Sequence, residues 1–301
     1  MVIKRYLYKA ETVYTLIIRS KGEIMALEKL VNIQGSLASS LGEIDPATWQ
    51  HSAEITKQRI TDTSLRNKWF WTADSALYRV VDGEIELDFA GRDQNLILQN
   101  IETATTQLVQ SQNYTPNKAG IDAVVASPAT LKIKVSDLKL TRHDNEFKYF
   151  EIDPTKYDSL NTAQRQLAER IYGQGTDFDA AMKMFSSPEV GIKKVRVYVL
   201  NPEYVKKHVK ADGAIVRACR LLDFDGNSIF FADDRYVGDR NGHLRGVRLV
   251  RAAEGGELQK TPVTIYTPQE ILAYLDKNPV NDPSFAAGLL NAVNTFYNPR
   301  K

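Results

Sequence analysis

Residues 193–253 read KKVRVYVLNPEYVKKHVKADGAIVRACRLLDFDGNSIFFADDRYVGDRNGHLRGVRLVRAA. Near the end of this stretch Val247 and Leu249 flank Arg248, an alternation that is typical of a half-buried strand. The segment before that strand is crowded with Asp, Asn, Gly, Arg and aromatic residues, which favours loops. A half-buried closing strand that follows a polar, aromatic segment predicts a ligand-binding surface on loops that a rigid scaffold supports.

The composition of residues 211–253 is unusual, because the segment contains no Lys, Glu, Gln, Met or Trp. One interpretation is a buried, turn-rich β region, which tends to exclude Lys and Glu. The other interpretation concerns codons, since a codon that ends in C or T cannot encode any of these five residue types. A segment randomised at the adenines of AAC-like codons would have the same composition. Composition alone leaves both interpretations open.

The runs RACRLLDFDGNSIFF, residues 217–231, and LRGVRLVRA, residues 244–252, resemble the end of a C-type-lectin-like domain. In particular, they resemble the variable proteins of diversity-generating retroelements and their relatives of the formylglycine-generating-enzyme type. The resemblance covers about residues 147–253. It implies a terminal strand of Gly-Val-Arg type that closes the fold and ligand-binding residues on the loops just before it. This chain continues past the expected closing strand, where many such proteins would stop.

The candidate ligand-binding residues lie in the polar segment 223–243. They are Asp223, Asp225, Asn227, Ser228, Phe230, Asp233, Asp234, Arg235, Tyr236, Asp239, Arg240, Asn241 and His243. Phe224, Ile229 or Phe231 are candidate anchors for this segment. A surface with charges of both signs and with aromatic rings favours a protein or glycan ligand. The arginines also allow a nucleic-acid interpretation, but the aspartates would repel phosphate, so nucleic acid is not the expected partner.

No catalytic signature is present in the sequence. The single cysteine, Cys219, has no adjacent His or carboxylate, and the oxidases that generate formylglycine use a pair of cysteines. The four histidines are far apart and lack metal-ligand spacing; they are His51, His143, His208 and His243. There is also no G-x-S-x-G nucleophile motif. We therefore expect a protein that is not an enzyme and has no cofactor.

One stretch partly matches a calcium-binding loop, namely Asp223-Phe224-Asp225-Gly226-Asn227. Oxygen ligands at its first, third and fifth positions fit the start of such a loop. The sixth position is Ser228 instead of Gly, and the twelfth is Asp234 instead of Glu. A hairpin turn at Asp225-Gly226-Asn227 explains the same residues, so no metal site is expected.

The overall composition fits an ordinary soluble globular protein, with 43% apolar and 25% charged residues in 301. The formal net charge of +2 implies no bulk attraction to nucleic acid or membrane.

We predict an α+β fold in four segments: residues 1–24 as a leader that is not native, 25–120 as an N-terminal α+β region with a β-hairpin, 121–254 as a C-type-lectin-like ligand-binding domain, and 255–301 as a helical tail. The codons for residues 21–24 can contain a ribosome-binding site, which favours Met25 as the natural start. The alternative is that residues 1–24 form an amphipathic arm of the protein.

The elements expected within these segments follow from local patterns. Asp82-Gly83 between two alternating runs predicts a β-hairpin, with Trp69 and Trp71 before it as core anchors. Further strands are expected at 131–135, 147–152 and 195–199, and helices at 93–110, 159–172 and 177–185. Residues 27–31 give a weak helical pattern. The tail carries two predicted helices, 267–277 and 283–297, which either dock on the body or join a partner subunit as a homo-oligomer.

These observations predict a non-catalytic ligand-recognition protein that displays a variable surface, with a diversity-generating retroelement target protein as the specific form. The alternatives are a nucleic-acid-associated protein and a virion or structural assembly protein. No signal peptide or transmembrane segment is predicted, so the cytoplasm is expected unless a virion or non-classical export carries the protein.

Overall fold

The computed structural model describes residues 3–9, 12–18, 26–210, 212–224, 227–234 and 240–248. The chain divides into two compact units, and the larger one comprises Val31–Leu249. The smaller unit includes β1 (Ile3–Lys9) and β2 (Thr12–Ile18), which pair antiparallel, and β2 also pairs with the first part of β3 (Ala26–Gln34).

One expectation for the N-terminal region differs from the structure. Residues 27–31 were expected to be helical, whereas they belong to β3. The physical reason is backbone pairing with a neighbouring strand, which overrides a weak local helical pattern. Within residues 1–24, which were expected to be a leader that is not native, two segments form paired strands.

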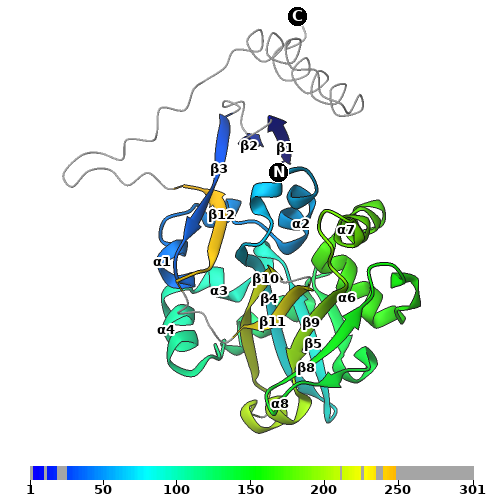
Figure 1. Cartoon of the computed structure of the whole chain (residues 1–301). Helices are drawn as coiled ribbons and strands as arrows, with labels where there is room; N and C mark the ends of the chain where they lie inside the picture. Colours follow the sequence, from blue (N-terminus) through cyan, green and yellow to red (C-terminus); the bar gives the residue numbers. More distant parts are fainter. Residues whose placement is uncertain are drawn as a thin grey trace, which may run out of the picture. The chain divides into compact units, whose positions relative to one another are not determined.

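The larger unit is built around one sheet with strand order β3-β12-β4-β10-β11-β9-β8-β7, and β5 and β6 continue from β4 (Figure 1). Its further strands are β4 (Trp69–Val81), β5 (Glu84–Ala90), β6 (Leu131–Lys134), β7 (Thr141–Arg142), β8 (Phe147–Ile152), β9 (Lys194–Leu200), β10 (Ala214–Phe224), β11 (Asn227–Asp234) and β12 (His243–Val247). Its helices are α1 (Leu37–Leu41), α2 (Ser52–Thr61), α3 (Leu96–Gln99), α4 (Ile101–Ser111), α5 (Lys118–Ala126), α6 (Thr162–Tyr172), α7 (Thr176–Ser186) and α8 (Pro202–His208). Short 3-10 helices occupy Pro46–Thr48, Thr63–Leu65, Arg92–Gln94, Val135–Leu138 and Tyr157–Ser159.

The predicted Asp-Gly hairpin is confirmed as the connection between β4 and β5. Val81 pairs with Glu84, so the loop consists of Asp82 and Gly83 alone. Both loop residues have positive φ, 51° and 80°. A two-residue turn with positive φ at both positions matches the right-handed twist of the strands, and Asp-Gly adopts it at low cost.

The helices follow their capping residues. Asn161 caps α6 and forms a capping box with Gln164, as its position in the sequence predicts. The single helix expected over 93–110 is instead divided into the 3-10 helix Arg92–Gln94, α3 and α4. Asn100, with φ −142° and ψ 51°, separates α3 from α4. Asn95 separates the 3-10 helix from α3: its side-chain oxygen accepts a hydrogen bond from the amide of Ile97 while its amide nitrogen donates to the carbonyl of Ala73. A buried asparagine that caps a new helix ends the preceding turn.

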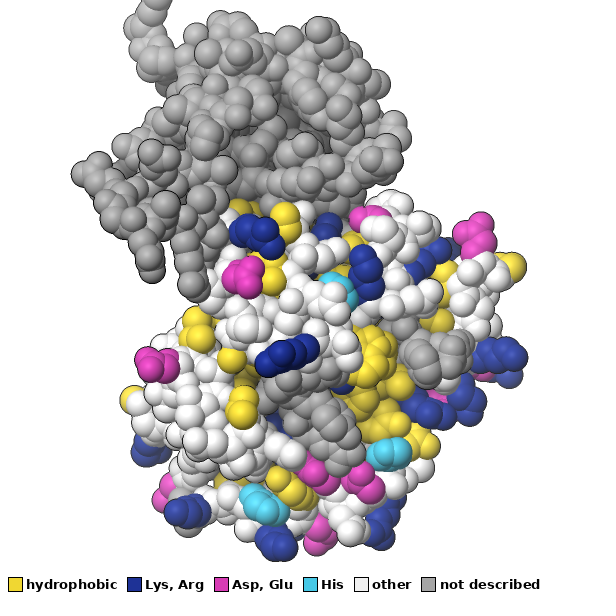
Figure 2. Space-filling view, turned by 60° about the vertical axis from the view of Figure 1, so that its left-hand side comes forward, with side chains coloured by type: hydrophobic (Ala, Val, Ile, Leu, Met, Phe, Trp, Pro, Cys, Tyr) yellow, Lys and Arg dark blue, Asp and Glu magenta, His cyan; other side chains and the backbone are white. Residues whose placement is uncertain are grey.

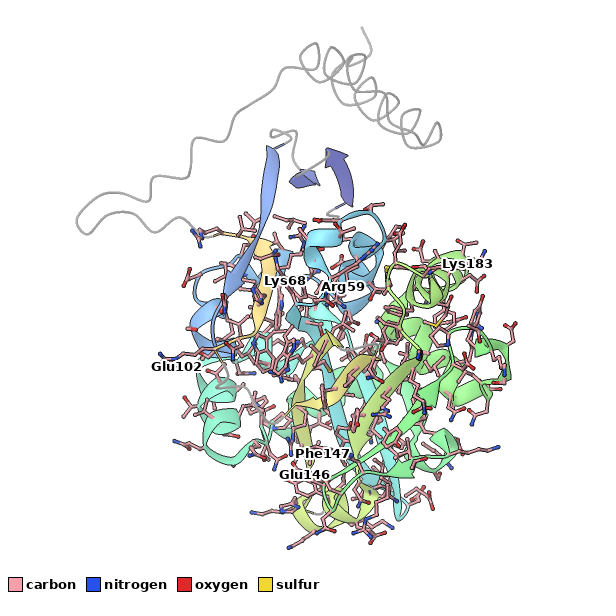
Figure 3. The ribbon with its side chains drawn as sticks, in the orientation of Figure 1. Arg59, Lys68, Glu102, Glu146, Phe147 and Lys183 are labelled. Atoms are coloured by element: carbon pink, nitrogen blue, oxygen red, sulfur yellow. The ribbon has the colours of Figure 1, made fainter. Side chains whose placement is uncertain are left out.

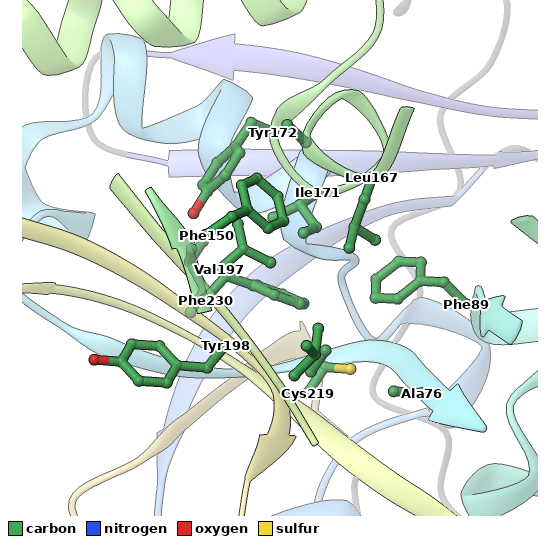
Figure 4. Close-up of a cluster of buried hydrophobic side chains, with 14 of the residues drawn as sticks. Ala76, Phe89, Phe150, Leu167, Ile171, Tyr172, Val197, Tyr198, Cys219 and Phe230 are labelled. Carbon is green, nitrogen blue, oxygen red and sulfur yellow. The ribbon is translucent and has the colours of Figure 1, made fainter. Parts of the chain in front are cut away.

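Strands β4 and β10 separate two hydrophobic cores, because alternate residues of each strand face opposite sides of the sheet. The first core lies under α2, α6 and α7 and includes Phe150, Ile171 and Phe230 (Figure 4). The second core lies under α1, α3, α4 and α5 and includes Trp71 and Leu244. Figure 1 shows α1, α3 and α4 on one side of β4 and β10 and α6 and α7 on the other.

The boundary expected near residue 120 does not divide the larger unit. Strand β10 pairs with β4 on one side and with β11 on the other, and β5 pairs with β6. Segments 25–120 and 121–254 therefore contribute strands to the same sheet and share both cores. The predicted helical tail, 255–301, lies outside the described residues.

Candidate ligand-binding face

The segment predicted to bind ligand begins in a β-hairpin. Strands β10 and β11 pair antiparallel, with Asp223 opposite Ser228 and Phe224 opposite Asn227. Asp225 and Gly226, which connect the two strands, lie outside the described residues. The hairpin interpretation of the Asp-rich run is therefore confirmed. Among the described residues, no group of three or more His, Cys, Asp or Glu side chains is arranged to hold a metal ion.

Strand β11 has an inner and an outer face. Ser228, Phe230 and Ala232 are buried, whereas Ile229 and Phe231 are half-buried on the other face. The ring centroid of Phe230 lies 5.9 Å from that of Phe89 in the first core. Ser228 and Phe230 were predicted to contact ligand, and this prediction is wrong for their side chains. The reason is the strand period of two, which turns these positions toward the core.

A row of aromatic rings crosses the outer face. Phe231 stacks on Tyr198 of β9, with centroids 5.0 Å apart and 24° between the ring planes. Tyr198 contacts Tyr149 of β8 at 5.2 Å, and these residues are direct cross-strand partners. Tyr198 itself is buried, with 6% of its surface exposed, whereas Phe231 and Tyr149 are half-buried. The sequence predicted the strand of Tyr198 but not this row. The available signal was the alternation of Arg196 and Tyr198 with the valines of β9, since alternate residues of a strand share a face.

Charged groups border this aromatic row. The guanidinium of Arg196 lies 5.3 Å from the ring centroid of Tyr149. Glu151 accepts from Nε of Arg196 at 3.2 Å and from Nζ of Lys194 at 2.8 Å. Burial by itself raises the pKa of Glu151, but the hydrogen bonds from Lys194 and Arg196 outweigh it and hold that pKa below its usual value. On the molecular surface, Figure 2 shows hydrophobic side chains gathered in a patch with Lys, Arg and His side chains at its border.

The closing strand, β12, runs parallel to β4, with Leu244 opposite Trp71. Leu244, Arg245 and Gly246 are buried, and Val247 is half-buried. The buried guanidinium of Arg245 donates to Asn32 Oδ1 at 2.7 Å and to Gln58 Oε1. Val247 and Leu249 were expected to share the inward face of a half-buried strand. Instead Val247 is half-buried and three consecutive residues before it are buried, because both faces of β12 are covered there. Leu249 lies outside the described residues.

The residues just before β12 differ in exposure. Arg240 and Asn241 are exposed, and Gly242 is buried. The half-buried His243 ring lies 5.8 Å from that of Phe70, and its Nδ1 is 3.3 Å from the carbonyl oxygen of Trp69. Burial lowers the pKa of His243, although its hydrogen bond with Trp69 acts in the opposite direction.

The other candidate positions are not all placed. Asp225, Arg235, Tyr236 and Asp239 lie outside the described residues, as do the side chains of Asp223, Asp233 and Asp234.

Three arginines of this Arg-rich part of the chain are structural. Arg217, Arg220 and Arg245 are each at most 4% exposed. The guanidinium of Arg220 lies between two indoles, 4.2 Å from the ring centroid of Trp69 and 5.0 Å from that of Trp71. Phosphate contacts require accessible cations, so the abundance of arginine here does not by itself indicate a nucleic-acid interface.

Comparison with known proteins places this geometry in a structural class. No protein-family model matches the sequence, and no curated protein matches it. One solved structure is similar over 74% of this chain and 98% of its own length, with a TM-score of 0.50 and 12% identity. That structure is described as showing accommodation of massive sequence variation in Nanoarchaeota by the C-type lectin fold.

This chain has a C-type lectin fold. The C-type-lectin-like architecture expected from residues 147–253 is confirmed, and it extends into the N-terminal half because β4 and β5 belong to the same sheet. Within the described ranges, no helix has the length and apolar character needed to cross a membrane.

Proposed function

We propose that this protein recognises a ligand without changing it chemically. The binding surface would combine segment 223–243 with the outer face of β11, β9 and β8. The observation that carries the proposal is the division along β11 and β12 between buried positions, such as Phe230 and Leu244, and outward positions, such as Phe231 and Asn241. A scaffold whose inward residues are fixed can change its outward residues at little cost in stability.

The chemistry of the outer face favours a protein or a glycan as the ligand. Aromatic residues and arginine are enriched where proteins bind other molecules. Aromatic rings supply a large contact area with few rotatable bonds, and the planar guanidinium of arginine supplies several hydrogen-bond donors. Half-buried Phe231 and Tyr149, with half-buried Arg196 beside them, have this composition, and the buried ring of Tyr198 supports them from between. The similar structure in Nanoarchaeota is described in terms of sequence variation on the same fold, which supports a variable recognition surface as the proposal.

The proposal is tested with two libraries of the full chain. The first randomises outward positions, namely Asn227, Ile229, Phe231, Arg240 and Asn241. The matched library randomises inward positions, namely Ser228, Phe230, Ala232, Gly242 and Leu244. Displayed variants are scored for resistance to protease and are then selected for binding to an arbitrary protein such as lysozyme. We expect the outward library to yield folded variants and binders, and the inward library to yield mostly unfolded chains.

Two results would count against the proposal. Equal loss of folding in both libraries would mean that the segment is core throughout. Folded outward variants without any binders would mean that this surface does not support recognition. Duplex DNA serves as a control ligand, because a nucleic-acid-associated protein would bind it with an affinity that falls steeply with salt.

We infer further that the coding region for residues 211–253 is a target of diversification. The inference rests on the absence of Lys, Glu, Gln, Met and Trp from this segment, including from outward positions where polar residues are otherwise common. The test is the flanking DNA. A reverse transcriptase gene and a near-copy of the 211–253 coding region would support the inference, and their absence would reject it.

A further inference from the structure

A second surface feature lies apart from segment 223–243. The β7–β8 hairpin and α8 enclose an open groove with a volume of about 610 Å³. The lining residues that matter here are Arg142, Glu146, Lys148, Tyr204, Lys207 and His208. A volume of several hundred Å³ is typical of sites for small molecules.

Two like charges face each other in this groove. Arg142 of β7 and Lys148 of β8 are direct partners in the antiparallel pair. Like charges directly opposite each other on neighbouring strands destabilise the sheet. In the described part of the chain, neither side chain has a carboxylate within 4.0 Å, and Arg142 donates to the neutral side chain of Asn145 instead. An anion between the two cations would remove the repulsion.

The carboxylate of Glu146, which lines the groove, is already matched by another residue. Glu146 accepts a hydrogen bond at 2.6 Å from Nη2 of Arg217, which is fully buried. Arg217 also donates to Asn113 Oδ1 at 2.8 Å. Figure 3 shows Glu146 beside α8 at the start of β8. Among the described residues that line the groove, the cations Arg142, Lys148 and Lys207 are accompanied by two carboxylates, that of Glu146, which bonds Arg217, and that of Glu203.

One wall of the groove carries a pair of flat rings. Tyr204 and His208 stack with centroids 4.0 Å apart and 26° between their planes. The hydroxyl of Tyr204 accepts from Nδ2 of Asn113 at 3.1 Å and from Nη2 of Arg217 at 3.2 Å. Nδ1 of His208 lies 2.8 Å from the carbonyl oxygen of Tyr204. These contacts fix the rings, and a fixed aromatic wall can stack against a sugar or base.

We propose that this groove binds a small phosphate ester that carries a ring. The phosphate group would lie between Arg142 and Lys148, where charge-assisted hydrogen bonds satisfy both cations. The ring would lie against Tyr204 and His208. This site does not depend on the recognition surface proposed above, because it shares no described residue with segment 223–243.

The test is calorimetric titration of the full-length protein with inorganic phosphate, glucose 6-phosphate and AMP. We expect saturable binding of at least one ester, tighter than that of inorganic phosphate. The double variant Arg142→Gln, Lys148→Gln should weaken it at least about tenfold, since two charge-assisted contacts are lost. Its melting temperature without ligand should stay equal or rise, because the cross-strand repulsion is removed.

The matched control is Lys156→Gln with Lys183→Gln, which removes the same charge from two exposed lysines that do not line the groove. Lys183 lies on α7, away from α8 (Figure 3). The proposal is overturned if neither ester binds at millimolar concentration, if inorganic phosphate binds as tightly as the esters, or if the control variant loses as much affinity as the groove variant. Binding of duplex DNA without binding of either ester would also overturn it. Variants of the outward library should retain ester binding, so failure of one proposal is distinguishable from failure of the other.

Discussion

Gly242 packs directly against the indole of Trp71. A Cβ atom on Gly242 would lie 2.9 Å from Cδ1 and 3.0 Å from Cε2 of that ring, and closer still to Nε1. The carbonyl of Gly242 also accepts a backbone hydrogen bond from Gly35 at 2.9 Å. The candidate ligand-binding segment 223–243 is therefore packed against the core immediately before β12.

Substitution of Gly242 tests this contact. Gly242→Ala should lower the free energy of unfolding by about 1–3 kcal/mol, because the added methyl group overpacks a buried ring. The neighbouring exposed substitution Asn241→Ala is the control and should change stability by about 0.5 kcal/mol or less. Urea denaturation measures both. Equal stability of the two variants would show that Trp71 moves aside without cost.

Two adjacent phenylalanines test the assignment of faces along β11. Phe230→Ala should cost about 3–5 kcal/mol, because the ring is fully buried in the first core. Phe231→Ala should cost clearly less, because its ring is half-buried on the outer face. The measurement is the free energy of unfolding in denaturant. The reverse order would mean that Phe231 is the core residue, contrary to the structure.

The buried ion pair between Arg217 and Glu146 predicts strong coupling. Glu146→Ala should cost about 3–5 kcal/mol, because it removes a carboxylate that bonds the buried guanidinium of Arg217. The double variant Arg217→Met, Glu146→Ala should recover part of that loss, since the buried positive charge is removed with its partner. Glu203→Ala is the matched control and should have little effect, because Glu203 is exposed. A double-mutant cycle measures the coupling, and additive effects would contradict it.

The lowered pKa of His243 predicts a dependence of stability on pH. At pH values below about 6.5 the unfolded chain binds a proton at this residue, whereas the folded chain does not until the pH falls below the lowered pKa. Stability should therefore decrease as the pH falls from 6.5 through that window. His243→Gln should reduce this slope. Identical pH profiles for the variant and the unaltered protein would exclude His243 as the cause.

Elements that depend on interactions between residues close in the sequence could be predicted from local sequence patterns. The Asp82-Gly83 hairpin and the Asn161 cap follow from residues that interact within a few positions in the chain. The alternation of valines with Arg196 and Tyr198 likewise predicted β9. The fold class also followed from the resemblance of residues 217–231 and 244–252 to the end of a C-type-lectin-like domain, because these short runs include the closing strand. By contrast, residues 27–31 of β3 were predicted to be helical. The local sequence has a weak helical pattern, and the strands that pair with β3 are not specified by that local sequence.

The sequence by itself determined the α+β class, the absence of a disulfide framework and the position of a polar segment before a closing strand. Only the tertiary structure decided which residues of that segment face outward. The strand period made Phe230 a core residue and left Phe231 outside, and the buried guanidiniums of Arg217, Arg220 and Arg245 became structural rather than ligand-facing. The physical reason is that exposure depends on what packs against each face of a strand, and the packing partners here come from helices and strands far away in the sequence.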